Sequence, residues 1–257
     1  MNVNSNSYTF SFATIMVLIV AALLSYAAIG LKPFQDTNIK LEKQQNILSS
    51  VGINIERSLA EDAYSKYIEK EIVLNYKGDA VDGVAFDVDL NKELKKDKDI
   101  QLLPLYISNI DDSKQYIIPL RGKGLWGPIW GFIALEEDLN TVYGAVFDHK
   151  AETPGLGAEI NQAFFQQPFV GKKIFDGDNL TSIRVVKGGA AKDDNYAVDG
   201  ISGGTITSDG VTDMLLERLN MYLPYINKVK DKIEEELINN LDSAIILNDS
   251  LRQKKYE

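Results

Sequence analysis

A threonine hydroxyl lies in a glycine-rich segment, Asp199–Thr207 with the sequence DGISGGTIT, just before an expected helix. Glycines let the backbone adopt positive φ and approach a ligand closely, and the free N–H groups at a helix start favour an anion. The candidate site for a bound or covalently attached phosphate therefore consists of Ser202, Gly203, Gly204 and Thr205. The alternative is a helix start capped by a hydroxyl and without a ligand, because the segment has no dinucleotide fingerprint and no Walker lysine.

The strength of phosphate binding at this segment differs between a bound and a covalently attached phosphate, and the residues leave both open. A helix start stabilises a nearby anion by about 0.3 to 1 kcal/mol, which is too little to hold a mononucleotide. A phosphate ester on Thr205 removes that need for affinity, so that a shallow pocket is enough.

A second segment, Arg121–Gly131 with the sequence RGKGLWGPIWG, suits a planar aromatic ligand. Its four glycines and two tryptophans make a poor regular element, but a tryptophan ring provides a flat apolar wall. The alternative is a β-turn between two strands with one buried tryptophan.

A third segment, His149–Glu159 with the sequence HKAETPGLGAE, offers hydrogen-bonding groups for the edge of a heterocycle. Thr153-Pro154-Gly155 predicts a turn, and it brings the Glu152 carboxylate, a hydroxyl and backbone N–H groups together. The alternative is a capped loop in which His149 is a surface or core residue. A lone histidine is weak evidence for catalysis.

Composition excludes several kinds of chemistry. The chain of 257 residues has no cysteine, which excludes disulfides, thiolate metal sites, iron–sulfur ligation and thiol catalysis. With His149 as the single histidine, a multi-histidine metal site is excluded as well. The formal net charge of −10 argues against a nucleic-acid partner. We expect no catalytic residue and no metal site on this chain.

The amino-terminal segment predicts a membrane anchor. Residues 8–31 are apolar and uncharged, and as a helix they extend about 36 Å, which spans a hydrocarbon core of about 30 Å. A cleaved signal peptide is the rival interpretation, but the basic amino-terminal region is missing and the apolar stretch is too long. Lys32, Lys40 and Lys43 follow the anchor, and the positive-inside rule taken alone places the soluble part in the cytoplasm.

Helices are expected on both sides of a strand-rich region. Pro33 is expected to end the anchor helix, a second helix is expected from near Asp36 to Gly52, and short helices are expected at 58–70 and 159–167. A helix is predicted from about Thr207 to Tyr222, with Thr207, Ser208 or Asp209 as its N-cap. A further charged helix is expected after Pro224, ending near Asn240.

Short apolar runs separated by glycine and aspartate predict β-strands in the middle of the chain. The expected strands are 72–76, 84–88, 102–107, 116–120, 129–135, 141–147 and one near 182–187. The segment Asn91–Asp99 is expected to be a charged, solvated loop.

The anchor and the segments GLWGPIWG, HKAETPGLGAEI and DGISGGTITS, in this order and at this spacing, resemble the NqrC family, the C subunits of the bacterial sodium-translocating NADH:quinone reductases. The resemblance covers the chain from the anchor and its stalk, LKPFQDTNIKLEKQQNIL, to about residue 222. It implies that FMN is joined through its phosphate to Thr205, which ends the family's Ser-Gly-Ala-Thr motif. Gly204 stands where the family usually has alanine.

The same resemblance assigns the other site residues. A separate flavin transferase is implied, which recognises a pattern corresponding to Asp199, Gly200, Ser202, Gly203 and Thr205. The isoalloxazine ring is expected to lie against Trp126, Glu152, Thr153, Gly155, Leu156 and Gly157.

The resemblance further implies an electron-transfer function. The chain is expected to pass electrons from a redox centre in the membrane part to the flavin of the NqrB subunit, in a complex with subunits A, B, D, E and F. That complex oxidises NADH, reduces ubiquinone and exports sodium, and NADH is oxidised on another subunit. The soluble domain is expected in the periplasm, on a single-pass anchor in the inner membrane. We follow the family here, since three lysines are a small topological signal.

Two alternatives to this function remain open at the level of sequence. One is the RnfG subunit of an Rnf-type electron-transport complex, which also carries FMN on threonine. The other is a membrane-anchored binding or scaffold protein without flavin.

The expected fold is α+β, with one transmembrane helix followed by an FMN-binding domain that has an antiparallel-rich sheet. The expected domains are an anchor at 1–35, a helical stalk at 36–70, the FMN-binding domain at 71–225, and a charged helix and tail at 226–257.

Overall fold

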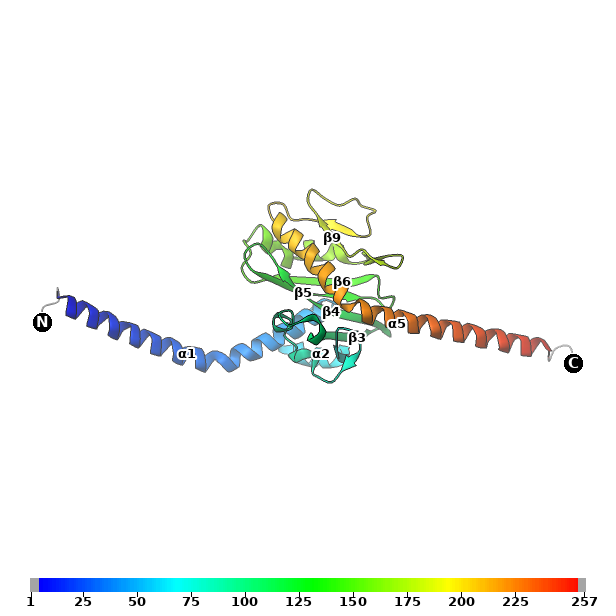
Figure 1. Ribbon diagram of the computed structural model, residues 1–257, viewed down its shortest axis with the longest axis horizontal. Coiled ribbons are helices and arrows are strands. Elements are labelled where there is room, and N and C mark those ends of the chain that lie inside the picture. Colours follow the sequence, from blue (N-terminus) through cyan, green and yellow to red (C-terminus); the bar gives the residue numbers. More distant parts are fainter. Residues whose placement is uncertain (1–4, 254–257) are drawn as a thin grey trace. The chain divides into compact units, whose positions relative to one another are not determined.

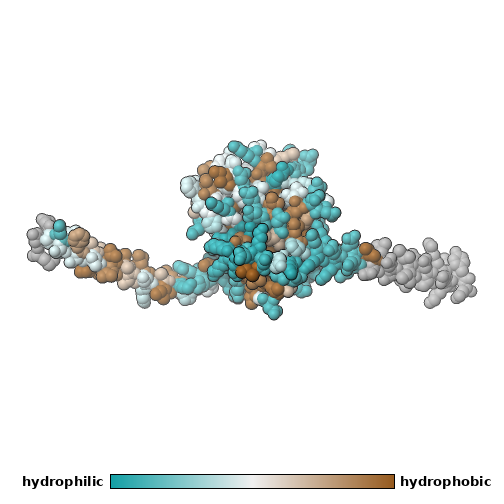
Figure 2. Space-filling model, viewed as in Figure 1, coloured by the Kyte–Doolittle hydropathy of each residue, from teal (hydrophilic) through white to brown (hydrophobic). Residues whose placement is uncertain are grey.

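Contacts divide the chain into two compact units, Met1–Gln44 and Gln45–Glu257. The computed structural model describes residues 5–253 (Figure 1). Helix α1, Asn6–Ser49, is long and apolar enough to cross a membrane. Its surface is hydrophobic in the amino-terminal part and becomes hydrophilic further along (Figure 2).

The expected helix end at Pro33 is wrong, because α1 continues through this residue to Ser49. A proline inside a helix removes one backbone hydrogen bond, whereas the flanking residues keep theirs. The Thr37 hydroxyl also donates to the Pro33 carbonyl at 3.0 Å. The expected second helix from Asp36 is therefore the end of the same helix.

The second unit is built on one antiparallel sheet with the strand order β2-β1-β3-β4-β5-β6. The strands are β1 Ile68–Leu74, β2 Ala80–Val81, β3 Leu103–Ile110, β4 Ser113–Lys123, β5 Pro128–Leu135 and β6 Val142–His149. Two small pairs follow, β7 Phe175–Asp176 with β8 Asn179–Leu180 and β9 Arg184–Val186 with β10 Ala197–Asp199. The predicted α+β class with an antiparallel-rich sheet is confirmed.

Both faces of the sheet are covered, and successive strand residues alternate between them. Ile118 belongs to the cluster that contains residues of helix α5, whereas Ile117 packs in a second cluster with Leu48 and Val51. This alternation follows from the two-residue period of a strand. The expected strands at 102–107, 116–120, 129–135 and 141–147 therefore fall on β3 to β6, with the first and the last beginning one residue too early. The runs at 72–76 and near 182–187 overlap β1 and β9.

Short helices occupy the connections of the second unit. They are η1 Arg57–Leu59, α2 Ala60–Tyr67, η2 Ala85–Asp87, α3 Leu90–Glu93, η3 Lys98–Ile100, η4 Gly157–Asn161, α4 Ala163–Gln166 and η5 Gln167–Phe169. The expected strand at 84–88 is wrong, because this segment forms the 3₁₀ turn η2. The turn is fixed by two hydrogen bonds: the buried Tyr106 hydroxyl donates to the Ala85 carbonyl, and the Glu71 carboxylate accepts from the Phe86 N–H.

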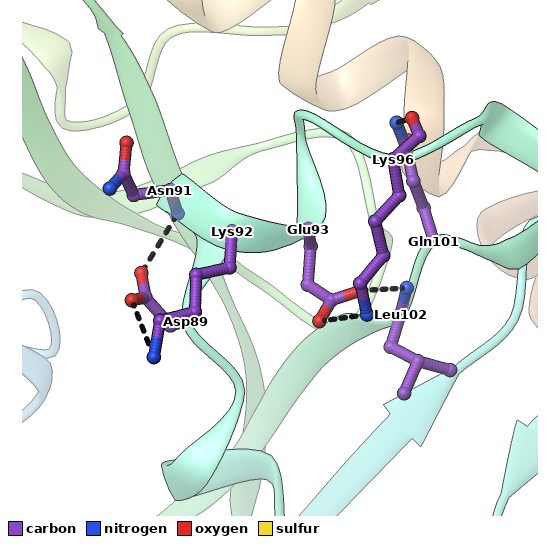
Figure 3. A network of polar contacts seen from close by, with 7 residues as sticks. All are labelled: Asp89, Asn91, Lys92, Glu93, Lys96, Gln101 and Leu102. Atoms are coloured by element: carbon purple, nitrogen blue, oxygen red, sulfur yellow. Dashed lines mark hydrogen bonds and ion pairs between the residues drawn. The ribbon is translucent and has the colours of Figure 1, made fainter.

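The expected loop Asn91–Asp99 is wrong in part, because α3 and η3 lie within it. The Asp89 carboxylate accepts a hydrogen bond from the Asn91 N–H at 2.9 Å and caps α3. Glu93 accepts from the Lys96 amine and from the Leu102 N–H, so that the segment is held by its own side chains (Figure 3).

Helix α5, Thr205–Gln253, lies across the sheet over β4 (Figure 1). It begins two residues before the expected start and passes through Pro224, where a new helix was expected. Tyr222 and Ile226 are both buried in the core that α5 shares with the sheet, so packing continues on either side of the proline. The expected boundary at Pro224 is therefore wrong.

Candidate functional site

The glycine-tryptophan segment forms the hairpin turn between β4 and β5. The Gly124 N–H donates to the Gly127 carbonyl at 2.8 Å, which closes a four-residue turn. Trp126 at the tip is 67% exposed, and Trp130 in β5 is half-buried. The turn of the alternative interpretation is present, but neither tryptophan is buried, so the Trp126 ring is available to a ligand.

A buried carboxylate joins this turn to the start of helix α5. Glu152 is 4% exposed and Thr207 is 1% exposed. One oxygen of Glu152 accepts a hydrogen bond from the Trp126 N–H at 2.9 Å, and the other accepts from the Thr207 hydroxyl at 2.6 Å. Glu152 thus connects two of the three candidate segments directly.

The charge state of Glu152 follows from these contacts. Burial by itself raises the pKa of the Glu152 carboxyl, but hydrogen bonds from the Thr207 hydroxyl and from backbone N–H groups of residues 125–127 hold the pKa below its usual value. The carboxylate is therefore an ionised acceptor at neutral pH. The His149 ring helps to hold the backbone of Glu152, because its Nδ1 accepts from the Glu152 N–H at 3.2 Å.

Glycines allow the turn at 153–157 to lie against the helix start. A Cβ at Gly157 would collide with the Thr207 hydroxyl and lie 2.7 Å from a Glu152 oxygen. Gly203 has φ of +76°, and a Cβ there would lie 2.6 Å from the Leu156 side chain. The turn and the segment at the start of α5 are therefore in contact.

The turn itself is held by a residue that the sequence analysis did not single out. The Gly155 N–H donates to a Glu159 carboxylate oxygen at 2.8 Å, and the Thr153 carbonyl accepts from the N–H groups of Leu156 and Ala158. Gly155 has φ of +76°, as the predicted turn requires. The sequence analysis placed Glu159 at the start of an expected helix at 159–167, which gave no sign of this contact with Gly155.

The hydroxyl residues in the first turn of helix α5 differ in burial. Thr207 and Ser208 are buried, and Ser208 accepts a hydrogen bond from the Ile201 N–H at 3.2 Å. Neither is the N-cap that we expected, because both lie inside the helix. Thr205, the first helical residue, is half-buried, and its hydroxyl has no hydrogen-bond partner among residues 5–253.

A cleft of about 420 Å³ opens beside Thr205 and is also lined by Lys187, Gly188, Asp199, Ser202 and Gly203. This volume lies in the range of small-molecule sites, about 300 to 1,000 Å³. Asp199 shapes the wall, because its carboxylate accepts from the Ala190 N–H at 2.7 Å. Lys187, which the sequence analysis did not single out, places an exposed amine at the cleft.

The residues fit a phosphorylated planar cofactor. A free hydroxyl and a helix start face a cleft with a lysine, and an exposed tryptophan lies at the hairpin that Glu152 joins to the same helix. Among residues 5–253 no group of three or more His, Cys, Asp or Glu side chains is placed to bind a metal.

Comparison with known proteins identifies one FMN-binding domain family and relatives that share one name. The FMN-binding domain family matches residues 124–220, which contain the segments His149–Glu159 and Asp199–Thr207 and the part of the glycine-tryptophan segment from Gly124 onward. The C subunit of the Na(+)-translocating NADH-quinone reductase of Vibrio vulnificus (strain YJ016) is 35% identical over 234 residues, covering 83% of this chain and 91% of that protein. The corresponding protein of Haemophilus ducreyi is 35% identical over 248 residues, covering 89% and 96%.

Solved structures agree with the sequence comparison. The crystal structure of the C subunit from Parabacteroides distasonis superimposes with a TM-score of 0.72 at 43% identity, covering 76% of this chain and 96% of that one. NqrC of Shewanella oneidensis superimposes with a TM-score of 0.64 at 26% identity, covering 75% and 98%. The chain carries an FMN-binding domain and belongs to the NqrC family, the C subunits of the Na(+)-translocating NADH-quinone reductases.

Proposed function

We propose that FMN is attached to this chain by an ester between its phosphate and the Thr205 hydroxyl. The observation that carries the proposal is that this hydroxyl has no partner among residues 5–253 and lines the cleft at the helix start, whereas Thr207 and Ser208 are turned inward. A phosphate on Thr205 lies where the free N–H groups of α5 favour negative charge. Lys187 adds a positive charge to the same cleft.

The chain's own residues position the rest of the cofactor. Trp126 offers a ring face, and the turn Glu152–Gly157 offers polar groups beside the Leu156 side chain. Ser202, Gly203 and Gly204 form the turn that leads into Thr205. Glu152 binds the hairpin and the helix start together, so that the tryptophan and the attachment point move as one body.

Bound FMN supplies one-electron redox chemistry, and the protein supplies position and electrostatics. We therefore propose that the chain passes electrons between a redox centre of the membrane part and the flavin of the NqrB subunit. No general base or nucleophile is required of this chain. In this proposal the assembled complex, with subunits A, B, D, E and F, oxidises NADH, reduces ubiquinone and exports sodium.

The location follows from helix α1 and from the family. We propose that α1 is retained as a single-pass anchor in lipid of the bacterial inner membrane, with the second unit in the periplasm. We propose that a flavin transferase recognises the pattern formed by Asp199, Gly200, Ser202, Gly203 and Thr205 in this unit.

Denaturing electrophoresis under ultraviolet light tests the attachment. The chain is produced together with a flavin transferase and purified from membranes. We expect a fluorescent band, its loss in Thr205→Val, and its retention in the matched variant Thr181→Val, which makes the same change away from the cleft. A wild-type chain without a fluorescent band would mean that this is an anchored protein without covalent flavin.

A further inference from the structure

We propose that a second site, a cationic groove beside the hairpin, binds an acidic peptide segment of a partner protein. The groove has a volume of about 320 Å³ and lies between α3, the end of β4 and helix α5. Its cationic side chains are Lys95, Arg121, Lys123 and Arg218, and its carboxylates are Asp213 and Glu217. This local surplus of positive charge contrasts with the formal net charge of −10 of the whole chain.

Three of the four cations of the groove lack partners within the described residues. Glu217 is engaged by Arg218, whose Nη2 lies 2.7 Å from the carboxylate. Lys95, Arg121 and Lys123 make no side-chain hydrogen bond or ion pair within the described range 5–253. Three unpaired cations in one groove cost electrostatic free energy, which an incoming carboxylate lowers.

A buried polar atom points to the same conclusion. Arg218 is 9% exposed, and its Nε is buried without a hydrogen-bond partner in the described part of the chain. Its Nη1 has only the Met221 sulfur, at 3.1 Å. A buried guanidinium with an unsatisfied N–H is unusual, and a ligand carboxylate beside it adds an acceptor to those that Glu217 and Met221 provide.

The walls of the groove are held in place before any ligand arrives. On one side, Asp89 and Glu93 hold α3 and the following segment, which carries Lys95 (Figure 3). On the other side, a Cβ at Gly122 would lie 2.7 Å from Met214, so the glycine lets β4 and α5 lie in direct contact. A rigid groove loses little conformational entropy when it binds.

The acids in the groove select a peptide rather than a phosphate polymer. Asp213 repels a ligand that carries only negative charge, whereas a peptide combines carboxylates with N–H donors. The β3–β4 pairing ends at Ile117 of β4, while β4 continues to Lys123 paired with β5 alone. The last three residues of this stretch, Arg121, Gly122 and Lys123, line the groove.

The choice of a protein partner rests on the proposed electron-transfer function. Lys123 directly precedes the hairpin turn that ends in Trp126, and a Cβ at Gly210 of α5 would collide with the Lys123 carbonyl. A partner held in the groove is therefore held next to the proposed cofactor site, where electron transfer needs it.

Carbodiimide cross-linking of the assembled complex in membranes tests the groove. The reagent condenses a lysine amine with a carboxylate to form an amide, and the water lost converts the carbodiimide to a urea. We expect peptide mass spectrometry to find Lys95 or Lys123 joined to an Asp or Glu of another chain. Links that run only to Asp213 or Glu217 of the same chain would overturn the proposal, as would the absence of any link.

A charge variant separates this contact from general electrostatics. Arg121→Gln removes one charge from the groove and is expected to lower the cross-link yield about two- to fivefold, as loss of one exposed ion pair implies. Lys114→Gln makes the same charge change at the other end of β4 and is expected to leave the yield unchanged. An equal loss in both variants would overturn the proposal.

The flavin is measured on the same samples, so the two proposals fail separately. A cross-link in a chain without flavin contradicts the proposed cofactor and not the groove. Flavin without an intermolecular cross-link contradicts the groove alone.

Discussion

Replacing Thr207 with valine removes the hydroxyl that joins the helix start to Glu152 while keeping a side chain of similar shape. The bond is 2.6 Å long and both residues are almost fully buried. Hydrogen bonds to charged groups contribute about 1.5 to 3 kcal/mol, and water cannot replace this one. We expect Thr207→Val to lower the free energy of unfolding by that amount, which is roughly a 10- to 150-fold change in the unfolding equilibrium.

Urea unfolding of the full-length chain in detergent measures this cost. Thr207→Ser is the matched control, because it keeps the hydroxyl and removes one methyl group, for which we expect about 1 kcal/mol. In a Trp130→Phe background Trp126 is the sole tryptophan, so its fluorescence reports the hairpin directly. We expect the Trp126 emission to change in Thr207→Val and to remain similar in Thr207→Ser.

One result would refute this reasoning. If Thr207→Val unfolds within about 0.5 kcal/mol of the wild type, the effect is that of an ordinary surface substitution and the bond to Glu152 is not holding the site together.

Three further predictions concern the same site. The pKa of Glu152 is lowered in the folded state, so its contribution to stability is complete above the unfolded pKa of about 4.3 and is lost as the pH falls through the lower folded pKa. We therefore expect the free energy of unfolding of Glu152→Gln to fall less steeply with acidification than that of the wild type, measured by urea unfolding from pH 6 to pH 2.5. Trp126→Ala should leave the flavin attached but shift its absorbance spectrum, and an unchanged spectrum would remove Trp126 from the site. Gly157→Ala should lower the free energy of unfolding, measured in urea, by about 1 to 3 kcal/mol, because the added Cβ meets Thr207 and Glu152. Gly127→Ala has room for its Cβ and should leave the free energy of unfolding nearly unchanged.

Local patterns in the sequence predicted most of the sheet. The short apolar runs between glycine and aspartate residues predicted strands that overlap β3 to β6, because such runs are typical of short buried strands. The turn at Thr153–Gly155 has the predicted glycine at positive φ. The strands and the turn both depend on residues that are close together in the chain, so the sequence alone predicts them.

Most failures lie where distant residues decide the structure, whereas Pro33 stays inside helix α1 because the flanking residues keep their hydrogen bonds within the helix. Pro33 and Pro224 were expected to end helices, but the helices on both sides continue through them. The hydrogen bond between Glu152 and Thr207 joins residues 55 positions apart, so no local sequence pattern predicts it. The groove at Arg121 combines three separate segments, so the charges that it collects are invisible in the linear sequence.

The central claim is that Thr205 carries FMN, and mass spectrometry tests it most directly. An ester between the FMN phosphate and a threonine hydroxyl adds about 438 Da, the mass of FMN less water. We predict that the chain produced with a flavin transferase gains this mass, and that fragmentation of the peptide containing Ser202, Thr205 and Thr207 places it on Thr205. An unmodified mass, or an adduct on any other hydroxyl of that peptide, would contradict the account.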